Sequence, residues 1–314
     1  MPRRKAADHW WIASYSALRI GDSVTASGDS APDTPLAQKL FDDERPETQA
    51  VRDPLPGNSD LHRFPRGPNP GTFLHGLLEW AGKEGFALAA SDPEGVLDTV
   101  ARRCNLRGWQ AWIKPLTDWL LHLLQMPLLQ GPQARPLALA ALDLPNQYRI
   151  EMEFWFASHY VDVTRLDELV RHYTHDNAPR APLQSTTLNG MFKGFIDLTL
   201  EHEGRYYVAD YKSNWLGDDD SAYTDEAMQA SILEHRYDLQ YTLYLLALHR
   251  QLKARLPGYD YDQHMGGALY LFLRGSGAPG QGVYYTRPPR ELIESLDRLF
   301  QGQSQAALRP GEFA

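Results

Sequence analysis

Residues 194–217, GFIDLTLEHEGRYYVADYKSNWLG, contain two runs with the alternating pattern of β-strands, GFIDLTL and YYVADYK. The Glu-His-Glu-Gly between them predicts a turn, so the segment is expected to form a β-hairpin. Asp197 lies in the first strand, whereas Asp210 and Lys212 share one face of the second, because alternate residues of a strand point the same way. We therefore expect two carboxylates and an ammonium group to meet near one end of the hairpin.

This combination of charges fits the chemistry of a metal site that acts on phosphates. Carboxylate oxygens are the ligands that Mg²⁺ prefers, and a neighbouring lysine can stabilise charge that develops on a phosphate. An Asp-x-Lys pattern alone is more often a surface charge pair, but the apolar Ile196 and Val208 indicate buried strands. The predicted strand 148–156 adds Glu151 and Glu153 on one face, and the pattern leaves open which of the two joins the cluster.

The rest of the chain predicts an α/β core with a mixed sheet flanked by helices, and a helical region on its N-terminal side. Thr72 is a plausible N-cap for the first of these helices. Further helices are expected over 95–130, over Asp225–Leu256 with a division near Tyr237, and over Arg290–Phe300, and further strands over Ala268–Arg274 and Gly282–Thr286.

Four segments are predicted from changes in composition. They are an N-terminal docking segment (1–20), an acidic linker rich in Pro, Ser and Asp (21–66), a globular domain (67–304) and a tail (305–314). The formal charge of the chain is −9, which at first argues against an anionic partner. Residues 21–60 hold nine acidic and three basic residues, however, and so account for −6 of that charge. The acidic total therefore does not exclude DNA.

Cysteine and hydropathy exclude several other classes of protein. Cys104 is the single cysteine, so an internal disulfide, a Cys-rich zinc site and a four-Cys iron–sulfur cluster are excluded. A lone cysteine fits a reducing compartment, and we expect a cytoplasmic protein. The most apolar stretch, Trp119–Leu129, has 11 residues, well below the roughly 20 that span a bilayer, so no membrane contact is expected.

Three further features are weak when each is taken singly. Gln240 and Tyr244 are spaced i,i+4 on one helix face, which is usually ordinary helix decoration. His75 borders an apolar helical stripe, where a histidine is more often a core residue than a ligand. The Gly-rich run 275–282 lacks the Lys-Ser/Thr of a phosphate-binding loop, which favours a hairpin loop.

Taken in order, these motifs resemble a known family. GFID and DYKSNWLG, followed by HRYDLQYTLY and GGALYLFLRG, resemble the nuclease domains of the RecB family, within the PD-(D/E)xK nuclease superfamily. GTFLH, which ends at His75, and EMEF, which begins at Glu151, fit the same pattern. The likeness extends over most of residues 67–302. One minor departure is Ile196 at the superfamily's nominal proline position, and no helicase motif such as Walker A is present.

The resemblance implies a restriction-endonuclease-like core and a role for each matching residue. His75, Asp197 and Asp210, with the backbone carbonyl of Tyr211, match the metal ligands, and Lys212 matches the catalytic lysine. The metal is expected to be Mg²⁺, for which Mn²⁺ or Ca²⁺ can substitute in binding; the number of ions stays open.

The remaining matches concern the acid of the preceding strand and a helix motif. Glu151 matches the acidic residue, although Glu153 can be confused with it, and Gln240 and Tyr244 match the Q-x-x-x-Y motif of RecB-like nucleases.

The function implied by the resemblance is Mg²⁺-dependent hydrolysis of DNA, with single strands favoured, in double-strand-break repair. Its implied partners are RecC- and RecD-like subunits and RecA. The alternative is a docking or regulatory module that binds those partners and has little nuclease activity of its own. An iron–sulfur nuclease is excluded by the cysteine count, and a base-reading restriction enzyme is disfavoured because no base-reading module is recognisable.

Overall fold

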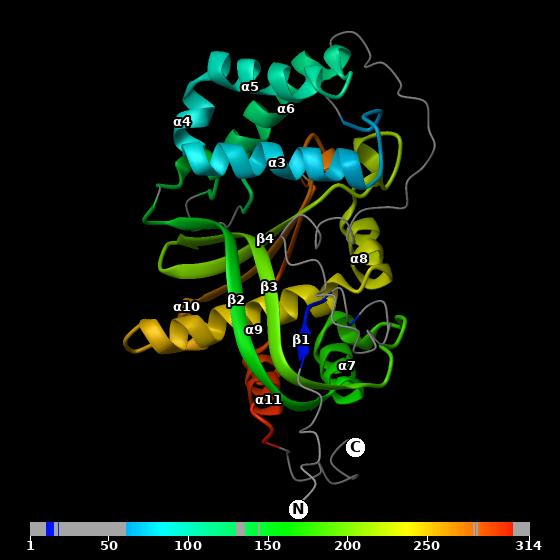
Figure 1. Ribbon diagram of the computed structural model, residues 1–314, viewed down its shortest axis with the longest axis vertical. Coiled ribbons are helices and arrows are strands. Elements are labelled where there is room, and N and C mark those ends of the chain that lie inside the picture. The colour runs from blue at the N-terminus through cyan, green and yellow to red at the C-terminus, as the bar shows by residue number, and fades with distance from the viewer. Residues whose placement is uncertain are drawn as a thin grey trace, which may run out of the picture.

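A six-stranded mixed sheet forms the centre of the structure, and helices cover both of its faces (Figure 1). The strands are β1 (Trp11–Ala13), β2 (Tyr148–Asp162), β3 (Thr187–His202), β4 (Arg205–Lys212), β5 (Met265–Phe272) and β6 (Val283–Thr286). The helices are α3 (Pro68–Glu84), α4 (Phe86–Ser91), α5 (Pro93–Asn105), α6 (Ile113–Gln125), α7 (Val163–Tyr173), α8 (Asp225–Glu234), α9 (Tyr237–Arg255), α10 (Tyr261–His264) and α11 (Arg290–Phe300). This computed structural model describes residues 11–15, 18, 61–129, 136–143, 145–278, 280 and 282–303.

The long strand β3 organises the sheet, whose order is β1-β3-β4-β5-β6 with β2 paired to β3. β2 runs antiparallel along nearly the whole of one side of β3. On the other side, β1 pairs in parallel with residues 190–192 and β4 pairs antiparallel with residues 198–202 (Figure 1). On this side of β3, residues 193–197 therefore pair with neither β1 nor β4, because the two strands diverge there.

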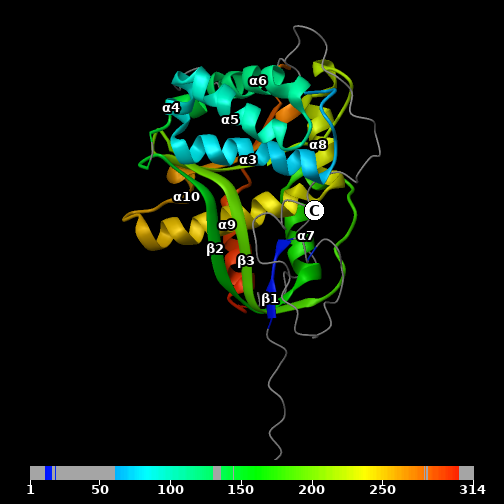
Figure 2. The same cartoon turned by 45° about the horizontal axis from the view of Figure 1, so that its top comes forward.

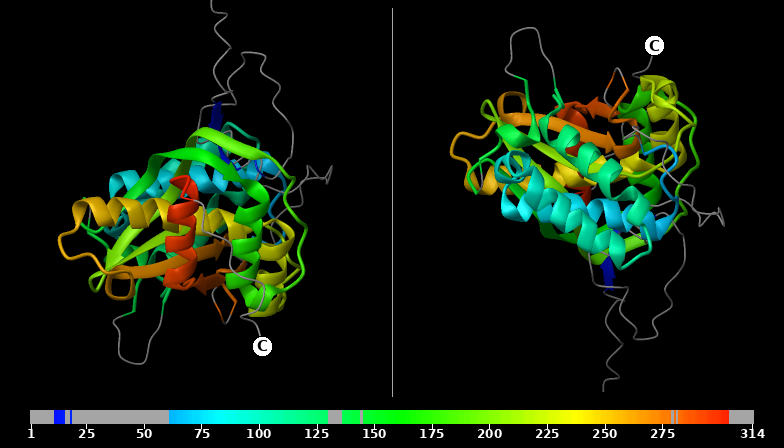
Figure 3. Two further views of the ribbon diagram at one scale, coloured as in Figure 1. Left: turned by 90° about the horizontal axis from the view of Figure 1, so that it is seen from below. Right: turned by 90° about the horizontal axis from the view of Figure 1, so that it is seen from above.

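The two helical layers divide the hydrophobic core. Helices α3 to α6 lie together over one end of the sheet (Figure 2), and their apolar residues pack against β4 and β5. Helices α7, α9 and α11 lie together on the opposite face when the molecule is seen from below (Figure 3). The polar Asp238 and Gln240 of α9 are buried with its leucines, as in a helix that is enclosed on every side.

The predicted fold class is confirmed, and so are the hairpin strands, the division between α8 and α9 and the C-terminal helix Arg290–Phe300. Two details were wrong. The first helix begins at Pro68 with Gly67 as its N-cap, not at Thr72, because proline suits the first turn of a helix. The strand expected over Ala268–Arg274 is β5, which begins at Met265 and ends at Phe272. In addition, helix α7 was not predicted.

The described part of the N-terminal segment contacts the start of α9 as well as the sheet. The Tyr15 hydroxyl donates to the main-chain oxygens of His235 and Arg236, at 3.0 and 3.1 Å, directly before α9. The predicted linker, apart from residues 61–66, and the predicted tail lie outside the described residues. None of the helices in the described part of the chain is long and apolar enough to cross a membrane.

Cys104 offers a test of this packing. Burial in the helical layer raises the pKa of its thiol to about 11. The thiolate is the reactive form, so the native protein should not react with a thiol reagent such as DTNB at pH 8. One equivalent should react in denaturant, since Cys104 is the single cysteine. Rapid reaction of the native protein would contradict the packing of α5.

Candidate active site

The opening of the sheet brings two acidic side chains to one place. The ladder between β3 and β4 ends at the pair Leu198–Ala209, and the next pair in the same register would be Asp197 and Asp210. The strands separate there, and Oδ2 of Asp197 accepts a hydrogen bond from the main-chain N–H of Tyr211 at 3.0 Å. A carboxylate therefore takes the place of a carbonyl in the ladder, which keeps the buried N–H satisfied.

Glu151 lies on the other side of Asp197. The register of β2 pairs Ile150 with Leu198 and Met152 with Ile196, which places Glu151 opposite Asp197. Glu151 has a φ of 49°, in the left-handed region that a residue with a side chain rarely adopts. Such a conformation costs on the order of 1–3 kcal/mol and is typical of functional sites.

The kink at this position changes which face each strand buries. Residues two apart in a regular strand share a face. Ile150 and Leu198 pack in the cluster under α3 and α6, whereas Met152 and Ile196 pack in the cluster around α9. Both strands thus switch faces where Glu151 meets Asp197, which leaves these two acids at the junction between the helical layers.

Glu153 does not share the environment of Glu151. It is exposed, and its carboxylate lies 3.2 Å from Nζ of Lys193. The charge of Glu151, in contrast, acts on Tyr211 at the centre of the site. The expectation that the two glutamates share one face was wrong, because the left-handed backbone at Glu151 breaks the alternation of β2.

Lys212 is held by residues of the sheet and of α9. Its side chain is 2% exposed, and Nζ lies 2.7 Å from Oδ2 of Asp210 and 3.0 Å from Oε1 of Gln240. Gln240 also accepts from the Tyr270 hydroxyl at 2.8 Å and donates from Nε2 to the Tyr244 hydroxyl at 3.1 Å. These contacts fix the amide, so the oxygen of Gln240 faces the lysine.

His75 reaches the site from the opposite layer. It is buried on α3, and its Nδ1 lies 3.3 Å from Oδ2 of Asp197. Its ring meets the ring of Tyr211 edge-on, with centroids 5.7 Å apart. The layer of helices α3 to α6 therefore contributes the imidazole of His75 to the site, next to Asp197.

Negative charge is concentrated around Tyr211. Burial raises the pKa of its hydroxyl well above the usual value, and the carboxylates of Asp197, Glu151 and Asp210 raise it further. The phenol therefore stays neutral, and three carboxyl groups stand close enough to act on it.

The carboxylate oxygens of the site fit a hard divalent cation in their chemistry, and His75 adds an imidazole nitrogen beside Asp197. Within the described residues, however, no three His, Cys, Asp or Glu side chains stand together as a ready-made metal site. Oδ2 of Asp210 faces Lys212. The three metal-binding side chains implied by the resemblance therefore remain a prediction.

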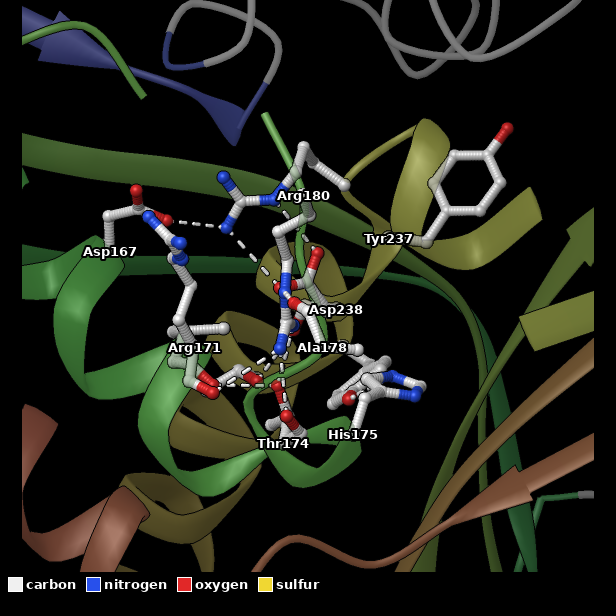
Figure 4. Close-up of polar contacts among 12 residues, drawn as sticks. Asp167, Arg171, Thr174, His175, Ala178, Arg180, Tyr237 and Asp238 are labelled. Atoms are coloured by element: carbon white, nitrogen blue, oxygen red, sulfur yellow. Dashed lines mark hydrogen bonds and ion pairs between the residues drawn. The ribbon is translucent and has the colours of Figure 1, made fainter. Parts of the chain in front are cut away.

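A buried ion network anchors the start of α9 (Figure 4). Arg180 and Asp238 are both fully buried and lie 2.7 Å apart, and Arg180 also donates to the main-chain oxygen of Thr174 at 2.8 Å. Arg236 contacts Asp238 at 3.1 Å and Asp167 at 2.6 Å. Burial lowers the pKa of Arg236, but Asp238 and Asp167 outweigh that effect and raise it above its usual value.

The network bears on the lysine through Tyr237, the first residue of α9. Nζ of Lys212 lies 3.9 Å from the centroid of the Tyr237 ring, a cation–π contact. Arg236 and Asp238 flank Tyr237, and their ion pairs hold the first turn of α9, which also carries Gln240. The sequence reasoning missed these residues, although Arg236 and Asp238 directly precede an apolar helical run.

Arg274 was also missed. Its buried guanidinium donates to the main-chain oxygens of Ser213 at 2.8 Å and of Phe64 and Pro65 at 2.9 and 2.7 Å. It therefore joins the residue after Lys212 to the segment that leads into α3, and so ties together the two layers that carry Lys212 and His75.

The structure brings eight of the predicted residues into one connected group. They are His75, Glu151, Asp197, Asp210, Tyr211, Lys212, Gln240 and Tyr244. Glu153 is the residue that it separates from them.

Comparison with known proteins agrees with this geometry. The profile of the PD-(D/E)XK nuclease superfamily matches residues 59–314. The chain therefore belongs to the PD-(D/E)XK nuclease superfamily.

Within the superfamily, the chain is similar to the RecB subunits of RecBCD enzymes. It is 40% identical to that of Escherichia coli K12 over 96% of this chain and 24% of the relative. It is 37% identical to that of Haemophilus influenzae over 77% of this chain and 19% of the relative. The RecB subunit of Mycobacterium tuberculosis H37Rv is 31% identical over 96% of this chain and 30% of the relative. The chain thus spans about a quarter of the length of these proteins.

The network at α9 is tested by Asp238→Asn. This change leaves Arg180 and Arg236 buried with one charged partner fewer, and we expect it to lower the free energy of unfolding by about 3–5 kcal/mol. Urea unfolding measures the loss. The control is Asp118→Asn, which removes the exposed i,i+4 pair with Lys114 and should cost less than about 1 kcal/mol. Equal effects of the two changes would contradict the role given to the network.

Proposed function

We propose that this chain is a metal-dependent deoxyribonuclease domain of the RecB type. The observation that carries the proposal is the meeting of Asp197, Asp210 and Lys212 where β3 and β4 separate, beside His75. Acids at a break in the sheet, with a buried lysine next to them, suit hydrolysis of a phosphodiester, since its transition state carries added negative charge.

A divalent cation, for which Mg²⁺ is our choice, would be held by His75, Asp197, Asp210 and the main-chain carbonyl of Tyr211. When bound, it polarises a phosphate oxygen and lowers the pKa of a water ligand. Glu151 would orient a water or help to hold a second ion.

Lys212 would orient the attacking water and stabilise charge on the phosphate. Its ammonium group is already positioned by Asp210 and Gln240, so little reorganisation is needed in the transition state. Gln240, oriented by Tyr244 and Tyr270, would thus act on the lysine and not on the substrate.

The substrate is DNA, with single strands favoured, and the partners are RecC- and RecD-like subunits and RecA. The similarity to RecB subunits of RecBCD enzymes supports this assignment. The chain would then supply the nuclease of a larger repair enzyme. A location in the cytoplasm follows from the same proposal.

A docking module with little nuclease activity is the second candidate. The chain matches only about a quarter of the length of its RecB relatives. This favours the docking module, because one part of a larger enzyme can depend on the other parts for its activity. The two candidates differ in whether the purified chain degrades DNA through Lys212.

Lys212→Ala should lower Mg²⁺-dependent cleavage of end-labelled single-stranded DNA by at least about 10²-fold, because the charge next to the phosphate is lost. Cleavage by the purified full chain is followed on gels, and circular dichroism checks that the variant is folded. Lys114→Ala, which changes an exposed lysine of α6, should cleave like the parent. Normal cleavage by Lys212→Ala would sink the assignment, and absence of cleavage in the parent would favour the docking module.

Asp210→Ala should weaken binding of Mn²⁺ or Ca²⁺, because one of the proposed carboxylate ligands is removed. Calorimetric titration of the purified chain measures the affinity without any need for cleavage. Asp98→Ala, on the exposed surface of α5, serves as the matched control. Unchanged Ca²⁺ affinity in Asp210→Ala would show that the ion binds elsewhere.

A further inference from the structure

The outer face of β2 and β3 next to the candidate active site carries a group of aromatic and basic side chains. Trp155 of β2 is the register partner of Lys193 of β3, and Phe195 follows two residues later on β3. Trp155 is 43% exposed. We call these three residues the β2–β3 patch.

The patch faces away from the core because the strands alternate. Phe154, Phe156 and Phe192 point inward and pack against α9 and α11, with Phe156 against Phe300 at 5.1 Å and Phe154 against Tyr244 at 5.8 Å. Trp155 lies between two of these inward residues, so it points to the other face. In Figure 1, none of the helices that the structure describes lies in front of the lower halves of β2 and β3.

Within the patch, a cation is held between two rings. Nζ of Lys193 lies 4.5 Å from the centroid of the Trp155 ring and 5.2 Å from that of Phe195. Its ammonium group lies 3.2 Å from a carboxylate oxygen of Glu153, and the lysine side chain is 12% exposed while the glutamate side chain is 45% exposed. A phosphate at this position would replace one anionic partner of the lysine with another, so the charge would stay paired.

The patch also lies on the path to the proposed catalytic acids. Phe195 and Lys193 precede Asp197 by two and four residues in the open stretch of β3, where β1 and β4 diverge. At a strand rise of about 3.3 Å per residue, the backbone of Phe195 lies about 7 Å from that of Asp197, and the backbone of Lys193 lies about 13 Å from it. A chain of nucleotides on the patch would thus lead directly to the site.

We infer that the β2–β3 patch binds single-stranded DNA, with bases stacked on Trp155 and Phe195 and a phosphate on Lys193. Flat rings beside a cation are the features that bind single strands with little regard to sequence. A duplex exposes no base faces along its length, so the patch selects the unpaired strand. This inference rests on the proposed function for its substrate and adds the surface that recognises it.

The test is binding of a fluorescent oligo-dT to the full chain in EDTA, where no cleavage occurs. Trp155→Ala should weaken binding by about 5- to 150-fold, the equivalent of 1–3 kcal/mol. Trp155→Phe should keep most of the affinity, because it keeps a ring. Tyr285→Ala is the matched control, since Tyr285 is 45% exposed on β6 at the other edge of the sheet, and it should bind like the parent.

An abasic oligomer of the same length separates stacking from charge. The parent should bind it more weakly than oligo-dT, and Trp155→Ala should lose most of that difference. Affinity unchanged in Trp155→Ala, or an equal loss for both oligomers, would overturn the inference. Trp155→Ala that binds DNA normally but no longer binds a RecC-like subunit would instead assign the patch to a protein partner.

Failure of the proposed nuclease function is distinguishable from failure of this inference. A parent that does not cleave DNA but binds oligo-dT through Trp155 would support the patch and reject the nuclease. If the parent cleaves DNA through Lys212 but Trp155→Ala does not change the affinity for oligo-dT, the nuclease function would be supported and the patch rejected. If both hold, Trp155→Ala should raise KM for the single strand with little change in kcat.

Discussion

The hydrogen bond from the main-chain N–H of Tyr211 to Asp197 is the contact on which the site depends. It allows β4 to leave β3 after Ala209 without an unsatisfied N–H in the core. Because the strands part there, Asp197 and Asp210 belong to adjacent strands but are not forced into one ladder pair. Asp197 then contacts His75 of α3, while Lys212, paired with Asp210, contacts Gln240 of α9.

Burying several charges in such a place requires that each have a defined partner. Lys212 and Asp210 form one such pair, and the network of Arg180, Arg236 and Asp238 forms a second, on either side of Tyr237. Ion pairs of this kind add little net stability, but removing one member leaves a charge in an apolar environment. Their consequence here is positional, because they hold the first turn of α9, which carries the ring of Tyr237 and the amide oxygen of Gln240 that contact Lys212.

The parts of the fold that could be predicted are those written in local patterns. The alternation in residues 206–212 and the amphipathic spacing of 290–300 each describe one element, and the observed elements follow them. The connected group around Lys212 could be named because a resemblance covered the whole ordered set of motifs. The hairpin pattern alone gave Asp197, Asp210 and Lys212 at one end of the paired strands, and left open which glutamate joins them.

What could not be predicted depends on contacts between distant parts of the chain. The left-handed backbone at Glu151 occurs where this residue lies opposite Asp197 of the neighbouring strand, and nothing in EMEF indicates it. The contacts of Arg274 with Ser213 and Pro65 join segments separated by 61 and 209 positions. Charged residues of this sort look like surface residues in a sequence, and only the tertiary fold shows that they are buried.

Under the proposed function, β3 would also explain how a chain with a net charge of −9 recognises an anionic strand. Asp197 and Lys193 lie on the same strand, so the distance between the acidic site and the β2–β3 patch is set by the backbone and needs no loop to become ordered. Recognition of this kind relies on rings and one held cation, and not on a broad positive field. A site built on a rigid strand keeps its geometry better than one built on loops. The overall charge is therefore a poor guide to the partner, whereas the order of side chains along β3 is a good one.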